Sequence, residues 1–86
     1  MYWVYILYSR NYQQHYVGHT NDLSQRFDRH NRGVVKSTKR YRPWELAHSE
    51  EYRSRSAAMR REKYLKSGIG RQEVKLILEN YLVQNG

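Results

Sequence analysis

The run YWVYILY at residues 2–8 constrains the fold more than any other stretch of the sequence. Its residues are almost all β-branched, aromatic or aliphatic, which predicts a strand buried on both faces. The chain has 86 residues, enough for one small domain spanning positions 1–86 and not for two. A domain of this size has a thin core, and because the chain lacks cysteine no disulfide reinforces it.

A second and a third strand are expected to join this one. The polar residues 9–13 form a turn, and residues 15–18 then make a short strand, so that the two strands predict an antiparallel hairpin. Residues 34–43 form a basic loop. In residues 44–52, every second side chain points to the same side, and that side carries Trp, Leu, His, Glu and Tyr. This pattern predicts a third strand with a partly polar face.

The first helix is expected between these strands, on residues 20–32. Either Thr20 or Asn21 can cap it, which places Asp22 in the first turn, where a negative charge favours the helix dipole. Gly33 then ends the helix.

Two more helices follow the third strand. Ser54 or Ser56 caps the first of them, which reaches about Lys66, and residues 68–70 serve as a connector. The apolar stripe of the last helix, at helical spacing, consists of Val74, Ile77, Leu78, Tyr81 and Leu82. The element order ββαβαα predicts an α/β fold in which helices flank a small three-stranded antiparallel sheet.

The charge of the chain indicates its partner. Sixteen Lys and Arg residues against eight Asp and Glu give a formal net charge of +8, and eleven of the sixteen are arginine, whose planar fork matches phosphate. This excess favours a polyanion such as nucleic acid, and a charge that serves solubility alone is the alternative. The longest apolar run is too short to cross a membrane and lacks the features of a signal peptide, so we expect a cytoplasmic protein without a membrane partner.

Two polar side chains of the first helix fall near its apolar face. On a helical wheel, His30 lies about 20° and Arg26 about 60° from Leu23. Exposure to solvent therefore does not explain their position. They are either a histidine at the edge of the core and an arginine in a structural ion pair, or parts of a functional site.

Glu62 raises a sharper question in the second helix. It is the only acid in residues 54–67 and falls between Ala58 and Leu65 on the predicted buried face, while the basic residues beside it point away. A carboxylate buried alone costs several kcal/mol, so it must be paired or bind a cation. A salt bridge to Arg26 is one interpretation, and a ligand for a hard divalent cation is the other.

These positions also resemble a known family, the GIY-YIG nucleases. Val4-Tyr5-Ile6 and Tyr16-Val17-Gly18 are similar to its paired strand motifs, with Val4 in place of the first glycine. Arg26 and His30 match positions on the first helix of the family, and Glu62 matches its metal-binding glutamate. The resemblance covers nearly the whole chain and extends to the small, single-domain, mostly uncharacterised branch.

The resemblance implies hydrolysis of phosphodiesters with one divalent ion, Mg²⁺ or Mn²⁺. Tyr16 would take a proton from the attacking water, with His19 as a partner or relay. Arg26 would neutralise charge that develops on the phosphate. Glu62 would hold the metal, which stabilises the departing 3′-oxygen.

The remaining candidates support or bind the substrate. Tyr5 would bind the phosphate or orient the second motif's tyrosine, and His30 would position the phosphate or the base. Contacts to the nucleic-acid backbone are expected from basic side chains, either in the 34–43 loop or beyond the second helix: Lys36, Lys39, Arg40, Arg42 and Arg71. For the loop residues, an ordinary solvated loop is the alternative. Backbone contacts of this kind carry little sequence specificity.

Three functions are compatible with these features. The leading hypothesis is a metal-dependent endonuclease that acts on DNA by its structure rather than its sequence, with a targeting protein as a second candidate partner. The alternative is a nucleic-acid-binding module with little catalysis. This alternative is favoured because the chain shows no match to the asparagine that follows the metal-binding glutamate in members of the family. A metal-independent ribonuclease with His19 and His30 as base and acid comes last, because it leaves Glu62 unexplained.

Overall fold

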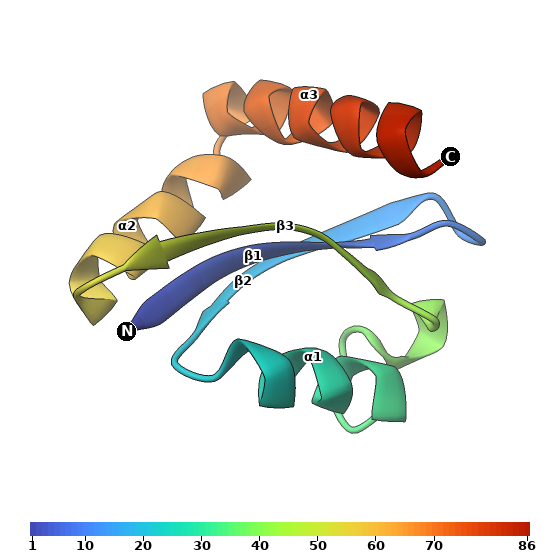
Figure 1. Ribbon diagram of the computed structural model, residues 1–86, viewed down its shortest axis with the longest axis horizontal. Coiled ribbons are helices and arrows are strands. Elements are labelled where there is room, and N and C mark those ends of the chain that lie inside the picture. Colours follow the sequence, from blue (N-terminus) through green and yellow to red (C-terminus); the bar gives the residue numbers. More distant parts are fainter.

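One strand, β1 (Tyr2–Ser9), lies buried at the centre of a three-stranded sheet. The structure is a computed structural model that describes residues 1–86. β2 (Gln14–Thr20) and β3 (Glu45–Tyr52) pair with β1 in antiparallel orientation, in the order β2-β1-β3 (Figure 1). Residues 4–7 of β1 are at most 1% exposed, which confirms the strand buried on both faces.

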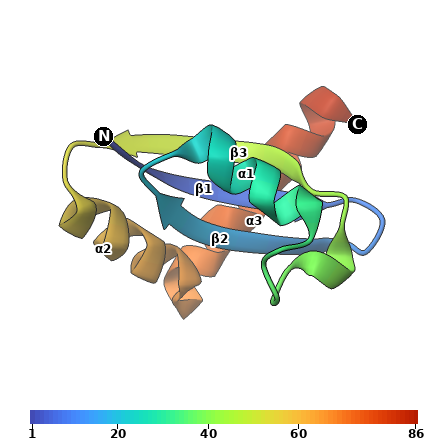
Figure 2. The ribbon, with the colours of Figure 1, turned by 90° about the horizontal axis from the view of Figure 1, so that it is seen from below.

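Helices cover both faces of this sheet. α1 (Leu23–Arg32) lies on one face, whereas α2 (Arg55–Lys66) and α3 (Gly68–Asn85) lie on the other (Figures 1 and 2). A 3₁₀ turn, η1 (Lys39–Tyr41), lies between α1 and β3. The predicted order ββαβαα is confirmed. None of the helices combines the length and the apolar character that crossing a bilayer requires.

The sheet divides the core into two unequal parts, because successive side chains of a strand point to opposite faces. The larger part lies against α2 and α3 and contains Val4, Ile6, Val17, Ala58, Leu65, Val74 and Leu78. In the smaller part, Tyr5, Leu7 and Trp44 pack with Leu23 and Phe27 of α1.

The beginning of α1 differs from the expectation. The side chain of Asp22 caps the helix by accepting a hydrogen bond from the backbone N–H of Gln25 at 3.0 Å. Thr20 instead accepts from the backbone N–H of Asp22, so the predicted cap at Thr20 or Asn21 was wrong. The end of the helix is as predicted, because Gly33 adopts the left-handed conformation with φ of 80°.

The second boundary that differs lies between α2 and α3. Residues 68–70 are not a connector, because α3 begins at Gly68. The side chain of Ser67 accepts a hydrogen bond from the backbone N–H of Gly70, which caps the helix and holds the glycine-rich segment in its first turn. At the start of α2, Ser54 provides the cap, one of the two residues predicted for this role.

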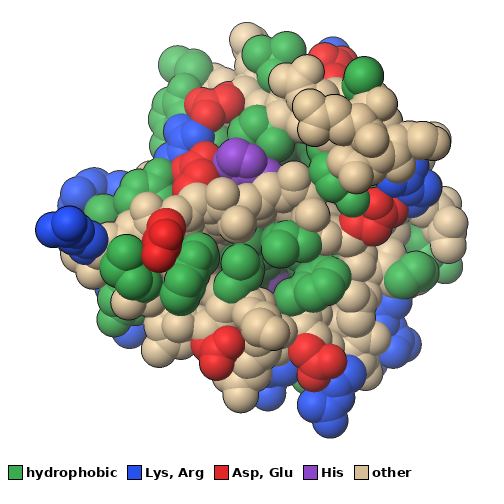
Figure 3. All heavy atoms as spheres, in the orientation of Figure 1, with side chains coloured by type: hydrophobic (Ala, Val, Ile, Leu, Met, Phe, Trp, Pro, Cys, Tyr) green, Lys and Arg blue, Asp and Glu red, His purple; other side chains and the backbone are tan.

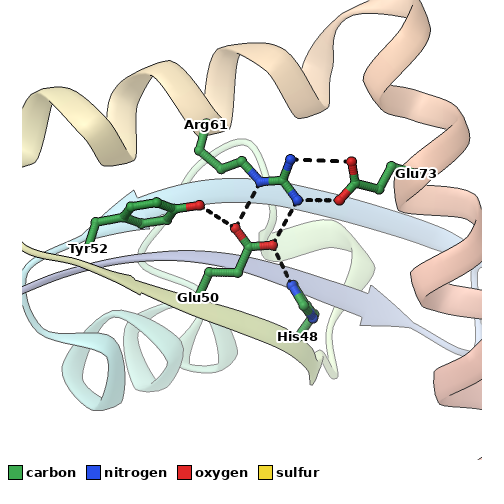
Figure 4. Close-up of polar contacts among 5 residues, drawn as sticks. All are labelled: His48, Glu50, Tyr52, Arg61 and Glu73. Carbon is green, nitrogen blue, oxygen red and sulfur yellow. Dashed lines mark hydrogen bonds and ion pairs between the residues drawn. The ribbon is translucent and has the colours of Figure 1, made fainter.

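A polar network joins β3 to α2 and α3 (Figure 4). Arg61 donates to both carboxylate oxygens of Glu50, from Nε at 2.8 Å and from one terminal nitrogen at 3.0 Å, and it also pairs with Glu73. Tyr52 and His48 hydrogen-bond the same carboxylate. Burial raises the pKa of Glu50, but the hydrogen bonds from Arg61, Tyr52 and His48 outweigh it and lower this pKa to about 2. The expectation that the basic residues of α2 point away was therefore wrong for Arg61.

Arg61→Met should lower the free energy of unfolding by about 2–3 kcal/mol at neutral pH, because it leaves a mostly buried carboxylate without its counter-charge. Urea denaturation measures this loss. Arg32→Met is the matched control, since Arg32 pairs with Asp28 in the solvent at 3.4 Å, and it should cost less than about 0.5 kcal/mol. Equal losses in the two variants would contradict a stabilising role for the network.

Candidate active site

Four of the six predicted catalytic side chains gather at the outer edge of β2: Tyr16, His19, Arg26 and Glu62. The other two, Tyr5 and His30, lie buried behind it. Tyr16 pairs with Leu7 and therefore lies on the face of the sheet that α1 covers. His19 pairs with Val4 and lies on the opposite face, toward α2. Because β2 is an edge strand, groups from both faces can approach one another around it. Gly18 lies on this edge as well.

On the α1 side, a chain of hydrogen bonds leads inward from Arg26. Its Nε donates to the hydroxyl oxygen of Tyr5 at 3.3 Å. The Tyr5 hydroxyl lies 3.0 Å from His30 Nε2, and His30 Nδ1 lies 2.8 Å from the hydroxyl of Thr38, which donates to the carbonyl of Val35 at 3.4 Å. Every group is satisfied when Tyr5 donates to Nε2 and Nδ1–H donates to Thr38.

Burial fixes the protonation of this chain. Burial lowers the pKa of His30 to about 4, helped by the charges of Arg26 and Arg29, so the imidazole is neutral at pH 7. Burial likewise raises the pKa of Tyr5 to about 12 against the effect of the Arg26 hydrogen bond, so the phenol keeps its proton. Tyr5 and His30 therefore form a neutral support for Arg26.

This burial changes the role of His30. The side chain is 0% exposed and both of its ring nitrogens are engaged, so the expected contact with a phosphate or a base does not fit. His30 orients Tyr5 instead. The hypothesis of a metal-independent ribonuclease, which needs His30 as an exchanging acid beside His19, fails for the same reason.

Tyr16 is in a different position from Tyr5. Its ring is held by neighbours, with centroid distances of 5.0 Å to His30 and 6.2 Å to Tyr5, but it is only half-buried. The Tyr16 hydroxyl faces Arg26, and Lys66 is the second cation beside this residue. The Lys66 Nζ lies 5.7 Å from the centre of the Tyr16 ring. Of the two motif tyrosines, Tyr16 is thus the one that is partly open to solvent and to a ligand.

On the α2 side, the carboxylate of Glu62 faces His19. Its Oε1 lies 2.5 Å from His19 Nδ1 and its Oε2 lies 2.6 Å from Lys66 Nζ. Burial raises the pKa of Glu62, but the hydrogen bonds from Lys66 and His19 outweigh it, so the pKa lies below its ordinary value and the group is ionised. The side chain is 19% exposed and both carboxylate oxygens have partners, so Glu62 is a mostly buried, paired carboxylate at the edge of the face that α2 turns to the sheet. The expected alternative, a salt bridge to Arg26, is not formed.

Two hollows lie beside Arg26 and Glu62, and His19 lines both of them. One, of about 780 Å³, lies along α2 and reaches Glu62, Lys63 and Lys66. The other, of about 250 Å³, reaches Arg26. An extended ligand can therefore pass from the guanidinium to the carboxylate.

The donor set of the site suits only one kind of metal. No three His, Cys, Asp or Glu side chains lie so that together they could hold a metal ion. A single ionised carboxylate beside an open hollow fits Mg²⁺ or Mn²⁺, which bind through one or two carboxylates and retain waters and phosphate oxygens as ligands. Lys66 competes for this carboxylate, but its side chain is half exposed and can move away.

The predicted backbone-binding cations fall into two groups. Arg71 on α3 lines a small hollow together with Tyr16 and Lys66, beside the candidate site. The loop residues lie elsewhere, around η1, and are exposed without a carboxylate partner: Lys36, Lys39, Arg40 and Arg42. Figure 3 shows Lys and Arg side chains along the lower right of the face drawn, where Figure 1 places η1.

Two residues of the site were missed in the sequence. Lys66 follows Glu62 by four positions in a helix, a spacing that brings opposite charges together and that indicates the pair. Thr38 carries no such signal, because its contact with His30 depends on how the 34–43 loop folds back onto α1.

Comparison with known proteins identifies the family and the fold of the chain. The model of the GIY-YIG catalytic domain matches residues 1–83. The chain belongs to the GIY-YIG family. Its relatives include UPF0213 proteins of Staphylococcus aureus strains Mu3 and N315, each 37% identical over 65 residues that cover 74% of this chain and 79% of the relative. The NMR structure of a UPF0213 protein from Bacillus halodurans is 28% identical, covers 90% of this chain and 85% of that one, and superposes with a TM-score of 0.53. The resemblance seen in the motifs is confirmed.

The glycine of the second GIY-YIG motif has a steric reason in this chain. A Cβ atom at Gly18 would lie 2.5 Å from the hydroxyl oxygen of Tyr5 and 2.9 Å from a ring carbon of Tyr16. Gly18→Ala should therefore lower the free energy of unfolding by about 1–3 kcal/mol, measured by urea denaturation, because the fully buried Tyr5 must shift. Gly68→Ala, where no atom lies within 4 Å of the added carbon, is the control and should be neutral or slightly stabilising. Wild-type stability in Gly18→Ala would refute the close contact.

The buried His30 of this GIY-YIG domain also predicts a pH dependence. Its pKa falls from 6.5 in the unfolded chain to about 4 in the fold, so the unfolded state binds the proton more readily. The free energy of unfolding should therefore drop as the pH falls from about 6.5 to 4, by roughly 3 kcal/mol. His30→Gln should flatten this part of the profile, whereas the loss from Glu50 begins only below about pH 4.5. If the free energy of unfolding of the variant fell with pH as steeply as that of the wild type, a group other than His30 would cause the pH dependence.

Proposed function

We propose that this protein is a metal-dependent endonuclease that hydrolyses phosphodiester bonds in DNA and selects its substrate by structure rather than by base sequence. The observation that carries the proposal is the set of three groups at the edge of β2. These are the half-buried phenol of Tyr16, the anchored guanidinium of Arg26 and the ionised carboxylate of Glu62. A net charge of +8 attracts a polyanion to the protein.

Each group has one task in this proposal. A water attacks the phosphorus atom and gives its proton to the oxygen of Tyr16, whose own phenolic proton passes on to His19. At the same time the bond from phosphorus to the 3′-oxygen breaks, and this oxygen takes a proton from solvent. Arg26 stabilises the charge that grows on the non-bridging oxygens, and it needs no reorganisation because Tyr5 already holds its Nε. His19, between the two hollows, relays the proton to solvent.

Glu62 would hold the divalent ion, Mg²⁺ or Mn²⁺. When bound, the ion supplies positive charge that stabilises the departing oxygen. The hydrogen bond from His19 fixes the direction of the carboxylate, and the hollow of about 780 Å³ along α2 leaves room for water ligands.

The exposed cations would guide the DNA to this site. Arg71 stands beside Tyr16, and the loop around η1 supplies further contacts to phosphates. Contacts of this kind do not read bases, which supports recognition of structure. A targeting protein would supply any further selectivity. The lack of cysteine supports a cytoplasmic location for the whole chain, which we treat as one domain.

Cleavage of plasmid and branched DNA tests the proposal. Tyr16→Phe and Glu62→Gln should each lower the rate at least about a hundredfold, while DNA affinity stays within about threefold. Chelation should abolish cleavage by the wild-type chain. Tyr64→Phe is the control, because Tyr64 is an exposed tyrosine of α2 with Arg61 over its ring and has no assigned role. Full activity in Glu62→Gln, or cleavage that persists under chelation, would sink the proposal.

One observation favours a second candidate, a nucleic-acid-binding module with little catalysis. Both oxygens of Glu62 are engaged, one by His19 and one by Lys66, so a metal must displace a partner. Salt-sensitive DNA binding without cleavage in any divalent metal would favour this candidate over the endonuclease.

Binding of Mn²⁺ without DNA measures this competition directly. Lys66→Met should lower the dissociation constant for Mn²⁺ roughly two- to fivefold, because an exposed ion pair with Glu62 no longer opposes the metal. Lys63→Met is the matched control, since Lys63 lines the same hollow without bonding the carboxylate, and it should change little. Glu62→Gln should abolish binding. Equal effects of the two lysine variants would point to general charge instead of competition.

A further inference from the structure

A further hollow with a distinct chemistry lies at the turn between β1 and β2. It measures about 530 Å³ and is lined by Tyr12, Asn31, Lys39, Arg40, Arg42 and Pro43, without an acidic residue. Both ribbon views place η1 beside this turn (Figures 1 and 2). We call it the Tyr12 hollow. Neither the proposed chemistry at the β2 edge nor the packing of the core accounts for it.

The aromatic part of the Tyr12 hollow is supported from within the protein. Tyr12 is 51% exposed and packs edge-on against Tyr41, with ring centroids 5.6 Å apart. Tyr41 in turn packs against the buried Trp44 at 6.3 Å, and its backbone carbonyl accepts a hydrogen bond from Ser9 at 2.6 Å. The Tyr12 ring therefore rests on a fixed base and leaves apolar surface open to a ligand.

Two of the three cations of the hollow are held in place, and none of the three has a counter-ion. Arg40 lies over the ring of Tyr41, 5.2 Å from its centre. Arg42 donates from Nε to the carbonyl of Lys39 at 2.8 Å, and its guanidinium lies so close to Gly33 that a Cβ there would fall 2.5 Å from it. No carboxylate pairs with any of these cations, whereas Arg10 and Arg61 are both paired. The hollow is thus ready for an anion.

An aromatic surface beside fixed cations is the arrangement that binds unpaired nucleotides, with the base stacked on the ring and the phosphates on the charges. Paired bases inside a duplex cannot reach such a ring, because they are stacked on one another. We propose that the Tyr12 hollow binds an unpaired nucleotide of the DNA substrate, its base on Tyr12 and its phosphates on Lys39 and Arg42. The nature of the ligand rests on the proposed function.

The position of the hollow defines the class of substrate. The pair Ser9–Gln14 closes the ladder at the turn, and the pair Val4–His19 lies five residues further along. At about 3.3 Å per residue, the Tyr12 hollow and the candidate active site are separated by about 16 Å along the strands. This length corresponds to about five nucleotide steps of a stacked DNA strand at 3.4 Å each, and to fewer steps where the strand is extended. The preferred substrate is therefore DNA with a single-stranded segment near the cleaved bond, such as a flap or a fork.

Fluorescence anisotropy in the presence of a chelator tests the hollow without cleavage. The probes are a fluorescein-labelled oligothymidine and a blunt duplex of the same length. Tyr12→Ala should weaken binding of the oligothymidine at least about fivefold and leave binding of the duplex within about twofold. Tyr12→Phe should bind like the wild type, because the ring is retained. Tyr64→Ala is the control and should have no effect. Tyr64 is also an exposed tyrosine, and it lies outside the hollow on α2, with Arg61 over its ring.

The outcomes separate this inference from the proposed function. Unchanged oligothymidine binding in Tyr12→Ala, an equal loss for the duplex, or an equal loss in Tyr12→Phe would each overturn the inference, even if the protein cuts DNA. Selective loss in Tyr12→Ala would uphold it, even if no DNA is cut and the endonuclease proposal fails. If the wild type cuts in Mn²⁺, flapped DNA should be cleaved faster than the fully paired duplex, and this preference should disappear in Tyr12→Ala. A preference that remains would also overturn the inference.

Discussion

The hydroxyl group of Tyr5 connects the parts of this protein that must stay in register. Tyr5 belongs to the central strand, and its side chain passes over β2 at Gly18, where the missing Cβ leaves room for it. At its end, the hydroxyl hydrogen-bonds His30 inside the α1 layer and accepts a hydrogen bond from Arg26. A group with so many neighbours and so little solvent has one low-energy arrangement, because an unpaired buried hydroxyl or imidazole would cost about 1–3 kcal/mol. The position of the guanidinium at the surface is thus determined by a contact made in the core.

The two tyrosines of the paired motifs consequently differ in chemistry although they stand on neighbouring strands. Tyr5 is neutral and buried, whereas Tyr16 is only half-buried and lies beside the cations Arg26 and Lys66. The charges around them are separated in space, with Arg26 on the α1 side of β2 and Glu62 on the α2 side. An edge strand allows this division, since a strand paired on both sides would block passage between the two faces.

The strand at 2–8, the element order and the end of α1 at Gly33 could be predicted because each follows from local composition or backbone geometry. The surroundings of Glu62 could not, because a helical wheel gives the direction of a side chain and not the partners that reach it. The wheel also gave Arg61 a solvent position, but a long side chain can extend along the helix to Glu50. The glycines at 68 and 70 suggested a loop, and the cap from Ser67 overrides that local preference.

The unequal division of the core has a consequence for the local unfolding of the protein. The α2 and α3 layers bury seven core residues, whereas the α1 layer buries three and carries the polar chain through His30. Partial opening of a native protein begins where the fewest apolar contacts resist it. Amide hydrogens of α1 should thus exchange before those of β1 and α3, while the larger half of the molecule stays intact.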